Sequence, residues 1–204
     1  MSRKAYSDDE RKQIRDKLIS TGLEFLGTYG VTQTSVENLC KVVGISKTFF
    51  YSFFPSKEEF ITQVLYHQQP KLLEHAKGLM KQPDLSWRDK IKQFLWDCCR
   101  GEKSGFVVLT MKEEQAVFQR LTSDSFRVFQ QKQIRIFKEV LTVFGLPVST
   151  FDPRLFGNLV LAMIMVRKAI PEEMPFLFPE MADEMVEFQI NAVIDQLESF
   201  RNSK

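Results

Sequence analysis

The 204-residue sequence has few of the residues that build metal sites and disulfide scaffolds. It contains three cysteines and two histidines, and no spacing among them matches a set of metal ligands. Three cysteines also cannot supply the bridges that hold small secreted domains together, so we expect free thiols and a reducing, cytoplasmic location. We expect no metal and no cofactor.

Charge of one sign and long hydrophobic runs are also scarce. The 28 basic and 26 acidic residues leave a net charge of +2, which excludes binding to nucleic acid through overall charge alone. The longest apolar run, residues 159–166, ends at Arg167 and is far shorter than the roughly 20 residues that a membrane-spanning helix needs. The sequence therefore predicts a soluble protein without membrane contact, in which any nucleic-acid contact comes from a local patch.

Catalytic patterns are missing as well. No histidine accompanies a nucleophile, and no glycine-rich loop is present to cradle a phosphate. The paired acids Glu113 and Glu114 are interpreted as solvated helix surface. We expect no catalytic residues, and the sequence does not predict an enzyme.

Hydrophobic residues make up 44% of the sequence, and they recur at spacings of three and four almost throughout. No segment alternates as a β-strand does, so the sequence predicts an all-α fold. The length suits one large domain, or a small domain followed by a larger one. We expect about nine helices, at residues 8–29, 35–42, 46–54, 56–80 with a kink or break at Pro70, 86–100, 111–121, 123–144, 152–169 and 179–200.

An aromatic segment lies between Gly44 and Pro55, where five of six consecutive residues from position 49 are aromatic. Gly44 favours a tight turn, Ser46 a helix start and Pro55 a helix end, so the segment is expected to be a short helix that cannot bury all its rings. The helix before it is expected to have Thr34 as its N-cap, with Glu37 completing a capping box. Two short helices joined by a glycine turn are typical of a helix-turn-helix.

Motifs surround this helix pair in a fixed order over residues 14–64. They are Phe25-Leu26…Gly30, Thr34-Ser35-Val36…Leu39-Cys40, Gly44-Ile45-Ser46-Lys47, Phe50-Tyr51 and Phe54-Pro55-Ser56-Lys57-Glu58-Glu59. In these motifs the chain resembles the tetracycline-repressor (TetR/AcrR) family of bacterial regulators. The resemblance implies a three-helix DNA-binding domain at residues 1–56, with its helix-turn-helix at about 35–54, and a larger helical ligand-binding and dimerisation domain at residues 57–204.

Helical periodicity divides the aromatic helix into two faces. Ile45, Phe50 and Phe54 are expected to pack against the first two helices. The opposite face, by the resemblance, enters the major groove of DNA. With the neighbouring phosphate contacts, the expected DNA-binding residues are Thr34, Ser35, Ser46, Lys47, Thr48, Phe49, Tyr51, Ser52, Phe53 and Lys57.

Individual roles follow from the chemistry of these side chains. Phe49 is expected to pack on a thymine methyl group, because phenylalanine cannot hydrogen-bond a base edge. Phe53 either does the same or lies half-buried against the first helix. Thr34, Tyr51 and Lys57 are expected at phosphates, which position the domain; the alternative for Lys57 is an ordinary solvated lysine.

The larger domain carries most of the phenylalanine and methionine, and a plain helical core would explain its wide apolar helix faces. The resemblance implies in addition a cavity for an inducer and a dimer interface on the last two long helices. The expected cavity residues are Phe94, Trp96, Cys98, Phe118, Phe126, Phe129, Gln130, Gln133, Phe137, Asn158 and Met163. The expected interface residues are Leu155, Leu159, Met163, Met185, Phe188, Ala192, Val193 and Leu197.

The function that the resemblance implies is a ligand-responsive transcriptional repressor. We expect a homodimer that binds a pseudo-palindromic operator in double-stranded DNA and is released by a small, largely apolar inducer. The alternative is a helical protein-interaction module without DNA binding, which a test for salt-dependent binding to promoter DNA would distinguish.

Overall fold

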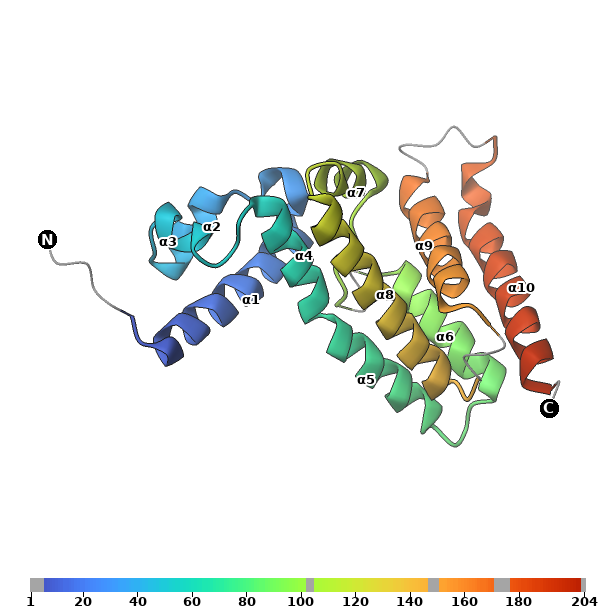
Figure 1. Ribbon diagram of the computed structural model, residues 1–204. Coiled ribbons are helices and arrows are strands. Elements are labelled where there is room, and N and C mark those ends of the chain that lie inside the picture. The colour runs from blue at the N-terminus through green and yellow to red at the C-terminus, as the bar shows by residue number, and fades with distance from the viewer. Residues whose placement is uncertain (1–5, 102–104, 147–150, 171–176, 203–204) are drawn as a thin grey trace, which may run out of the picture.

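The computed structural model describes residues 6–101, 105–146, 151–170 and 177–202, and every regular element in these ranges is helical. The all-α prediction is confirmed. In Figure 1, α1 to α3 lie together at the N-terminal end, and α5, α6, α8, α9 and α10 pack side by side in the larger half. The elements are α1 (Asp8–Gln33), α2 (Val36–Val43), α3 (Lys47–Tyr51), α4 (Lys57–His67), α5 (Gln69–Met80), α6 (Trp87–Cys99), α7 (Met111–Phe118), α8 (Ser123–Val143), α9 (Pro153–Ala169), the 3-10 helix η1 (Pro179–Met181) and α10 (Ala182–Asn202).

Hydroxyl side chains set where most of these helices begin. In each case the hydroxyl accepts a hydrogen bond from a backbone N–H three residues further on, which otherwise has no partner within the helix. The capping residues are Ser7, Ser35, Ser46, Ser56, Ser86, Thr110 and Thr122. The predicted break before α5 is confirmed too, because Pro70 lies in its first turn, where the missing N–H costs nothing.

The helices enclose two hydrophobic cores. The N-terminal core is built mainly from α1 to α4, and it also receives Leu109 and Val117 from the region of α7. The second core lies between α5, α6, α8, α9 and α10. Since α7 packs on the N-terminal core while α8 follows it directly, α7 lies where the two halves of the chain meet. The domain boundary at residues 56 and 57 stays a prediction.

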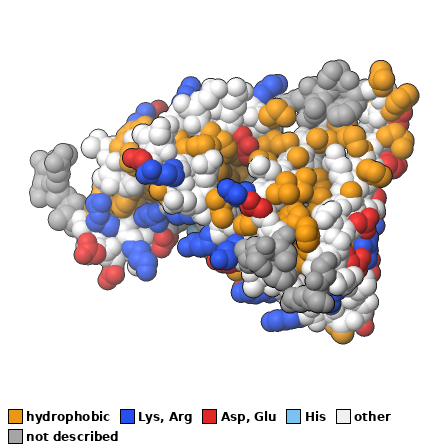
Figure 2. Space-filling view, turned by 45° about the vertical axis from the view of Figure 1, so that its right-hand side comes forward, with side chains coloured by type: hydrophobic (Ala, Val, Ile, Leu, Met, Phe, Trp, Pro, Cys, Tyr) orange, Lys and Arg blue, Asp and Glu red, His pale blue; other side chains and the backbone are white. Residues whose placement is uncertain are grey.

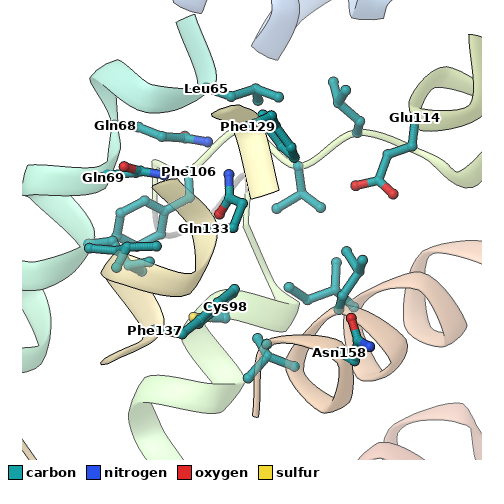
Figure 3. Close-up of a pocket in the computed structure, with 18 of the residues that line it drawn as sticks. Leu65, Gln68, Gln69, Cys98, Phe106, Glu114, Phe129, Gln133, Phe137 and Asn158 are labelled. Atoms are coloured by element: carbon teal, nitrogen blue, oxygen red, sulfur yellow. The ribbon is translucent and has the colours of Figure 1, made fainter. Parts of the chain in front are cut away.

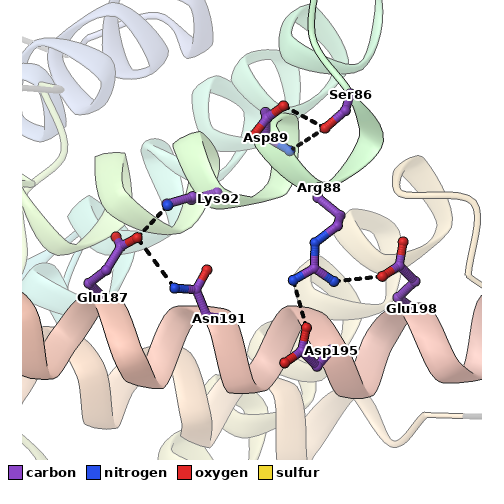
Figure 4. A network of polar contacts seen from close by, with 8 residues as sticks. All are labelled: Ser86, Arg88, Asp89, Lys92, Glu187, Asn191, Asp195 and Glu198. Atoms are coloured by element: carbon purple, nitrogen blue, oxygen red, sulfur yellow. Dashed lines mark hydrogen bonds and ion pairs between the residues drawn. The ribbon is translucent and has the colours of Figure 1, made fainter.

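Polar contacts hold α10 against α6 (Figure 4). Arg88 forms ion pairs with Asp195 and Glu198, each with an N–O distance of 2.6 Å. One turn further along α6, Lys92 pairs with Glu187. Such partly exposed pairs contribute little individually, but together they fix which face of α10 turns away from α6.

The outer surface carries many hydrophobic side chains. Figure 2 shows them as a broad patch across the centre and right of one face. Within the described ranges, no helix combines the length and the apolar composition that crossing a bilayer requires.

Candidate DNA-binding surface and ligand cavity

A tight turn at Gly44 joins α2 to α3. Gly44 has φ of 80°, a left-handed conformation that glycine adopts without steric cost, and its N–H donates to the carbonyl of Cys40 at 2.9 Å. Ser46 then caps α3, accepting from the N–H of Phe49 at 3.1 Å. The predicted turn and cap are confirmed, although α3 ends at Tyr51 rather than close to Pro55.

The predicted cap of α2 is wrong by one residue. Ser35 is the N-cap, and its hydroxyl accepts from the N–H of Asn38 at 3.1 Å. Thr34 instead closes the last turn of α1: its side chain is 0% exposed and its hydroxyl donates to the carbonyl of Gly30 at 2.7 Å. Thr34 therefore has no free hydroxyl for a phosphate, and the half-buried Ser35 takes its place at the start of α2.

The two faces of α3 are divided as the periodicity predicts. Phe50 and Phe54 are buried in the N-terminal core, and Ile45 packs against it from a half-buried position. The exposed residues of the helix and its ends are Ser46, Lys47, Thr48, Tyr51 and Ser52. Their contacts with DNA stay a prediction.

Phe49 and Phe53 are less free than the sequence suggested. Phe49 stacks on Tyr6, with ring centroids 4.6 Å apart, and meets Phe53 edge to face at 4.9 Å. The guanidinium of Arg11 lies 5.3 Å from the centroid of Phe49 and 4.8 Å from that of Phe53. We call these four residues the Phe49 cluster. It leaves both phenylalanines half-buried, so the half-buried alternative holds for Phe53, and Phe49 shares it.

Lys47 forms an ion pair with Glu37, an acid on α2. Its ammonium lies 2.8 Å from the carboxylate of Glu37, and both side chains are largely exposed. The hydrogen bond and charge of each partner raise the pKa of Lys47 and lower that of Glu37. A phosphate or base edge would have to compete with Glu37 for this cation.

α1 bends at Gly30, and the bend is tied to two other helices. Gly30 has φ of 70° and ψ of −179°, outside the helical range. The carbonyl of the next residue, Val31, accepts from the ammonium of Lys57 at 2.7 Å. Burial is the main reason that the pKa of Lys57 lies below its usual value. Lys57 is therefore not a solvated lysine, and to reach a phosphate it would have to leave Val31.

Glu113 holds the same bend from α7. Its carboxylate accepts from the N–H of Val31 at 2.6 Å, and its other oxygen accepts from the N–H of Thr110 at 2.9 Å. A β-carbon at position 30 would lie only 2.5 Å from the Glu113 carboxylate, so the contact requires glycine there. The interpretation of Glu113 as solvated surface is wrong, since this carboxylate joins α7 to the bend in α1.

A cavity of about 670 Å³ lies between the helices of the larger half (Figure 3). This volume is typical of small-molecule sites. Its lining residues are Leu65, Gln68, Gln69, Leu72, Phe94, Cys98, Phe106, Val107, Val108, Leu109, Glu114, Phe118, Phe126, Phe129, Gln130, Gln133, Ile134, Ile136, Phe137, Arg154, Gly157, Asn158, Val160, Leu161 and Ile164.

The cavity contains the predicted Phe94, Cys98, Phe118, Phe126, Phe129, Gln130, Gln133, Phe137 and Asn158. Two predicted residues lie elsewhere. The indole N–H of Trp96 donates to Glu187 on α10 at 2.7 Å, so this ring faces the opposite side of α6. Met163 is buried in the second core. Helical spacing predicts which side chains share a face of a helix, but not which neighbouring helix packs on that face. The errors at Trp96 and Met163 follow from this.

Glu114 was missed as a cavity residue. It lies next to Glu113 on α7, and its side chain is directed into the cavity from the side opposite Gln68 and Gln69 (Figure 3). Burial raises the pKa of Glu114 to about 7. Across the cavity, the amide nitrogen of Gln69 is buried without a hydrogen-bond partner among the described residues. The signal in the sequence was an acid one turn before the apolar Phe118 on the same helix face.

The predicted dimer residues fall into two groups. Leu155, Phe188 and Ala192 are exposed, with Phe188 at 75%, and Leu159 and Met185 are half-buried. Met163, Val193 and Leu197 are instead buried in the second core of the same chain, so they cannot contact a partner directly. Of the predicted interface residues on α9 and α10, only those of the first group are accessible to a partner chain.

The thiols and potential metal ligands form no further site. Cys40, Cys98 and Cys99 are free and buried, and burial raises the pKa of each thiol, in the case of Cys99 to about 11. In the part of the chain that the structure describes, no group of three or more His, Cys, Asp or Glu residues could hold a metal ion.

Residues 18–64, from within α1 to within α4, match the domain family described as bacterial regulatory proteins, tetR family. The N-terminal region is a TetR-family DNA-binding domain. No curated protein matches the chain. The match to the TetR family covers the helix-turn-helix. The rest of the chain is compared with solved structures through its fold.

Solved structures share the fold of most of the chain. NemR of E. coli in its reduced form is 20% identical, with a TM-score of 0.55 over 86% of this chain and 96% of that one. A TetR-family transcriptional regulator of Pectobacterium atrosepticum is 17% identical, with a TM-score of 0.56 over 96% and 97%. A TetR-family regulator of Streptomyces coelicolor is 15% identical, with a TM-score of 0.54 over 91% and 96%. At these identities the likeness shows a shared fold, an N-terminal helix-turn-helix domain followed by a helical domain.

Proposed function

We propose that this chain is a cytoplasmic transcriptional repressor that binds a DNA operator and leaves it when a small, largely apolar ligand enters the cavity. The observation that carries the proposal is the TetR-family domain at residues 18–64, in which α3 leaves a row of polar side chains exposed. We do not assign an enzymatic activity to it.

In this proposal α3 lies in the major groove of double-stranded DNA. Lys47, Thr48 and Ser52 offer charge and hydroxyl groups to base edges. Tyr51, half-exposed at the flank, and Ser35 at the N-terminus of α2 offer hydroxyl groups to phosphates. Phe49 packs in the Phe49 cluster, and the part of its ring that stays exposed can contact a thymine methyl group.

The ligand response is proposed to pass through α7. Two adjacent residues of this helix face different partners: Glu114 faces the cavity, and Glu113 holds the N–H of Val31 at the bend in α1. A ligand that displaces Glu114 must move the backbone or the side chains of α7. The hydrogen bond between Glu113 and Val31 would transmit that movement to α1, on which α2 and α3 pack. The ligand-free and ligand-bound states would then differ in the contact between Glu113 and Val31, so that ligand binding shifts the equilibrium between them.

Pairing through α9 and α10 is proposed to give the homodimer. The exposed Leu155 and Phe188 and the half-buried Leu159 and Met185 offer an apolar face that a second copy would cover. A two-fold dimer presents two α3 helices to successive major grooves, roughly 34–36 Å apart, and so reads a pseudo-palindrome. Sedimentation at micromolar concentration should show a dimer, and a monomer would contradict this step.

Fluorescence anisotropy with the DNA that flanks the gene tests the DNA-binding proposal. The chain should bind this DNA more tightly than a scrambled duplex of equal length, and its affinity should fall steeply with salt. Lys47→Ala should weaken binding and reduce the salt slope by about one ion. Lys77→Ala is the matched control, because it removes a partly exposed, ion-paired lysine on α5 far from α3 (Figure 1).

Equal binding to both duplexes at every salt concentration would contradict the proposed operator recognition. Absence of binding to either duplex would instead favour a helical protein-interaction module. The Lys77→Ala control should match the parent chain within error in both cases.

A further inference from the structure

The cavity contains one acid and one base, and only the base has a charged partner. Arg154 is ion-paired with Asp152, with its Nε 3.0 Å from both carboxylate oxygens. The carboxylate of Glu114 makes no hydrogen bond or ion pair with another described residue, and burial alone accounts for the direction of its pKa shift. The unbalanced charge among the cavity-lining residues is therefore the carboxylate of Glu114.

A lysine on α8, the helix that carries several of the lining residues, does not balance it. The ammonium of Lys132 on α8 lies 3.8 Å from the ring centroid of Tyr66 on α4, and burial lowers the pKa of this lysine. Tyr66 in turn packs on Phe129, at a centroid distance of 5.7 Å. Lys132 is thus engaged with the outer side of this aromatic group rather than with Glu114.

Aromatic rings gather on the same part of the cavity as the acid. Phe118 lies one helical turn after Glu114 on α7, and its ring is 4.9 Å from Phe129 and 5.5 Å from Phe126 on α8. All three rings line the cavity. Ring faces carry negative potential, so they attract a cation that has left water, and they pack on apolar surface as well.

We infer that the cavity binds an organic cation with a large apolar body, whose charged centre lies between the Glu114 carboxylate and the rings of Phe118, Phe126 and Phe129. This inference rests on the proposed function, and it names the chemical class of the inducer. A buried carboxylate costs free energy until it is paired, and a ligand cation supplies the missing partner in a site of low dielectric constant. Opposite the acid, the free amide N–H of Gln69 offers a hydrogen bond to an acceptor at the far end of a ligand that spans the cavity.

Tetraphenylphosphonium and tetraphenylborate are suitable probes, because they share size and shape and differ in the sign of their charge. Calorimetric titration of the whole chain should show that the phosphonium cation binds about tenfold or more tightly than the borate anion. Glu114→Gln keeps the shape of the side chain and should remove most of this preference, mainly by weakening the cation. Phe118→Leu should weaken the cation as well, while leaving the anion within about twofold.

Glu184→Gln is the matched control, since it neutralises an exposed carboxylate at the start of α10 and should keep the full preference for the cation. Melting temperatures of the variants should show that all of them are folded. Equal binding of the two ions, a preference for the anion, a preference that survives in Glu114→Gln, or failure of both ions to bind would overturn the inference.

DNA binding by the same preparations separates the two proposals. If the chain binds its operator but shows no Glu114-dependent preference for the cation, the ligand class is wrong and the regulator stands. If it shows that preference but binds no DNA, the regulator is wrong. Release of operator DNA by the phosphonium cation, and its loss in Glu114→Gln, is the result expected when both hold.

Discussion

Replacing Glu113 with alanine removes its capping-box bonds to Thr110 and the bond from α7 to the bend in α1. The carboxylate accepts from the N–H groups of Val31 and Thr110 and from the hydroxyl of Thr110, at 2.6, 2.9 and 3.1 Å. Losing the capping-box bond to Thr110 costs about 0.5–1.5 kcal/mol, and a hydrogen bond to a charged group contributes about 1.5–3 kcal/mol. Val31 is buried, so its N–H would be left without a partner. We expect the free energy of unfolding to fall by about 2–4 kcal/mol.

For a chain of this length such a loss corresponds to a melting temperature lower by roughly 5–15 °C. Urea denaturation followed by circular dichroism gives the free energy, and thermal denaturation gives the temperature. Glu113→Gln should be intermediate, because one amide oxygen can satisfy either Val31 or Thr110 but not both. A loss below about 1 kcal/mol for Glu113→Ala would refute the reasoning. Where the variant stays folded, its operator affinity should respond less to ligand than that of the parent chain.

Three further changes have definite expected outcomes. Glu37→Gln should release Lys47 and strengthen binding to operator DNA about two- to fivefold at low salt, with a smaller gain at high salt, measured by anisotropy; weaker binding would contradict this. Because the pKa of Glu114 is about 7 in the folded chain against an ordinary 4.5, the folded state keeps a proton that the unfolded chain releases. Stability should therefore fall as pH rises from about 4.5 to 7, and Glu114→Gln should lose this dependence. In urea denaturation at pH 8 it should exceed the parent by about 2 kcal/mol, less than the full shift would give because solvent reaches the half-buried side chain. Phe49→Ala should lower the free energy of unfolding by about 1–2 kcal/mol through its contacts with Tyr6 and its neighbours, and an unchanged melting temperature would mean that the ring is free.

The helix-turn-helix could be predicted because its turn and its helix caps depend on residues that are adjacent in the sequence. Gly44 permits the left-handed turn, and Ser46 satisfies a free N–H at the start of α3; each effect depends on a few adjacent residues. The cap of α2 was harder, since Thr34 and Ser35 are both good caps. The choice was decided by Gly30, whose carbonyl takes the hydroxyl of Thr34 and leaves Ser35 as the cap.

The surroundings of the functional residues depend on contacts between distant parts of the chain. The periodicity of the sequence does not predict these contacts. Phe49 has the spacing of an exposed residue, but Tyr6, which precedes α1, covers it. Trp96 has the spacing of a cavity residue, but an acid on α10 fixes its ring elsewhere. The acids Glu113 and Glu114 have the composition of solvated surface, and only the packing of α7 shows that neither is.

The ties at both ends of α1 make this helix a lever. Its first part, from Asp8 to the bend at Gly30, is about 33 Å long at 1.5 Å per residue. Near one end, Arg11 lies over the rings of Phe49 in α3 and of Phe53 just after it. At the other end, Glu113 of α7 accepts the hydrogen bond from Val31. A tilt of about 5° about the end at Val31 would move the far end by about 3 Å, the length of one hydrogen bond. In the proposed DNA complex, a displacement of that size at the end near α3 would be enough to lift its exposed side chains out of register with the bases.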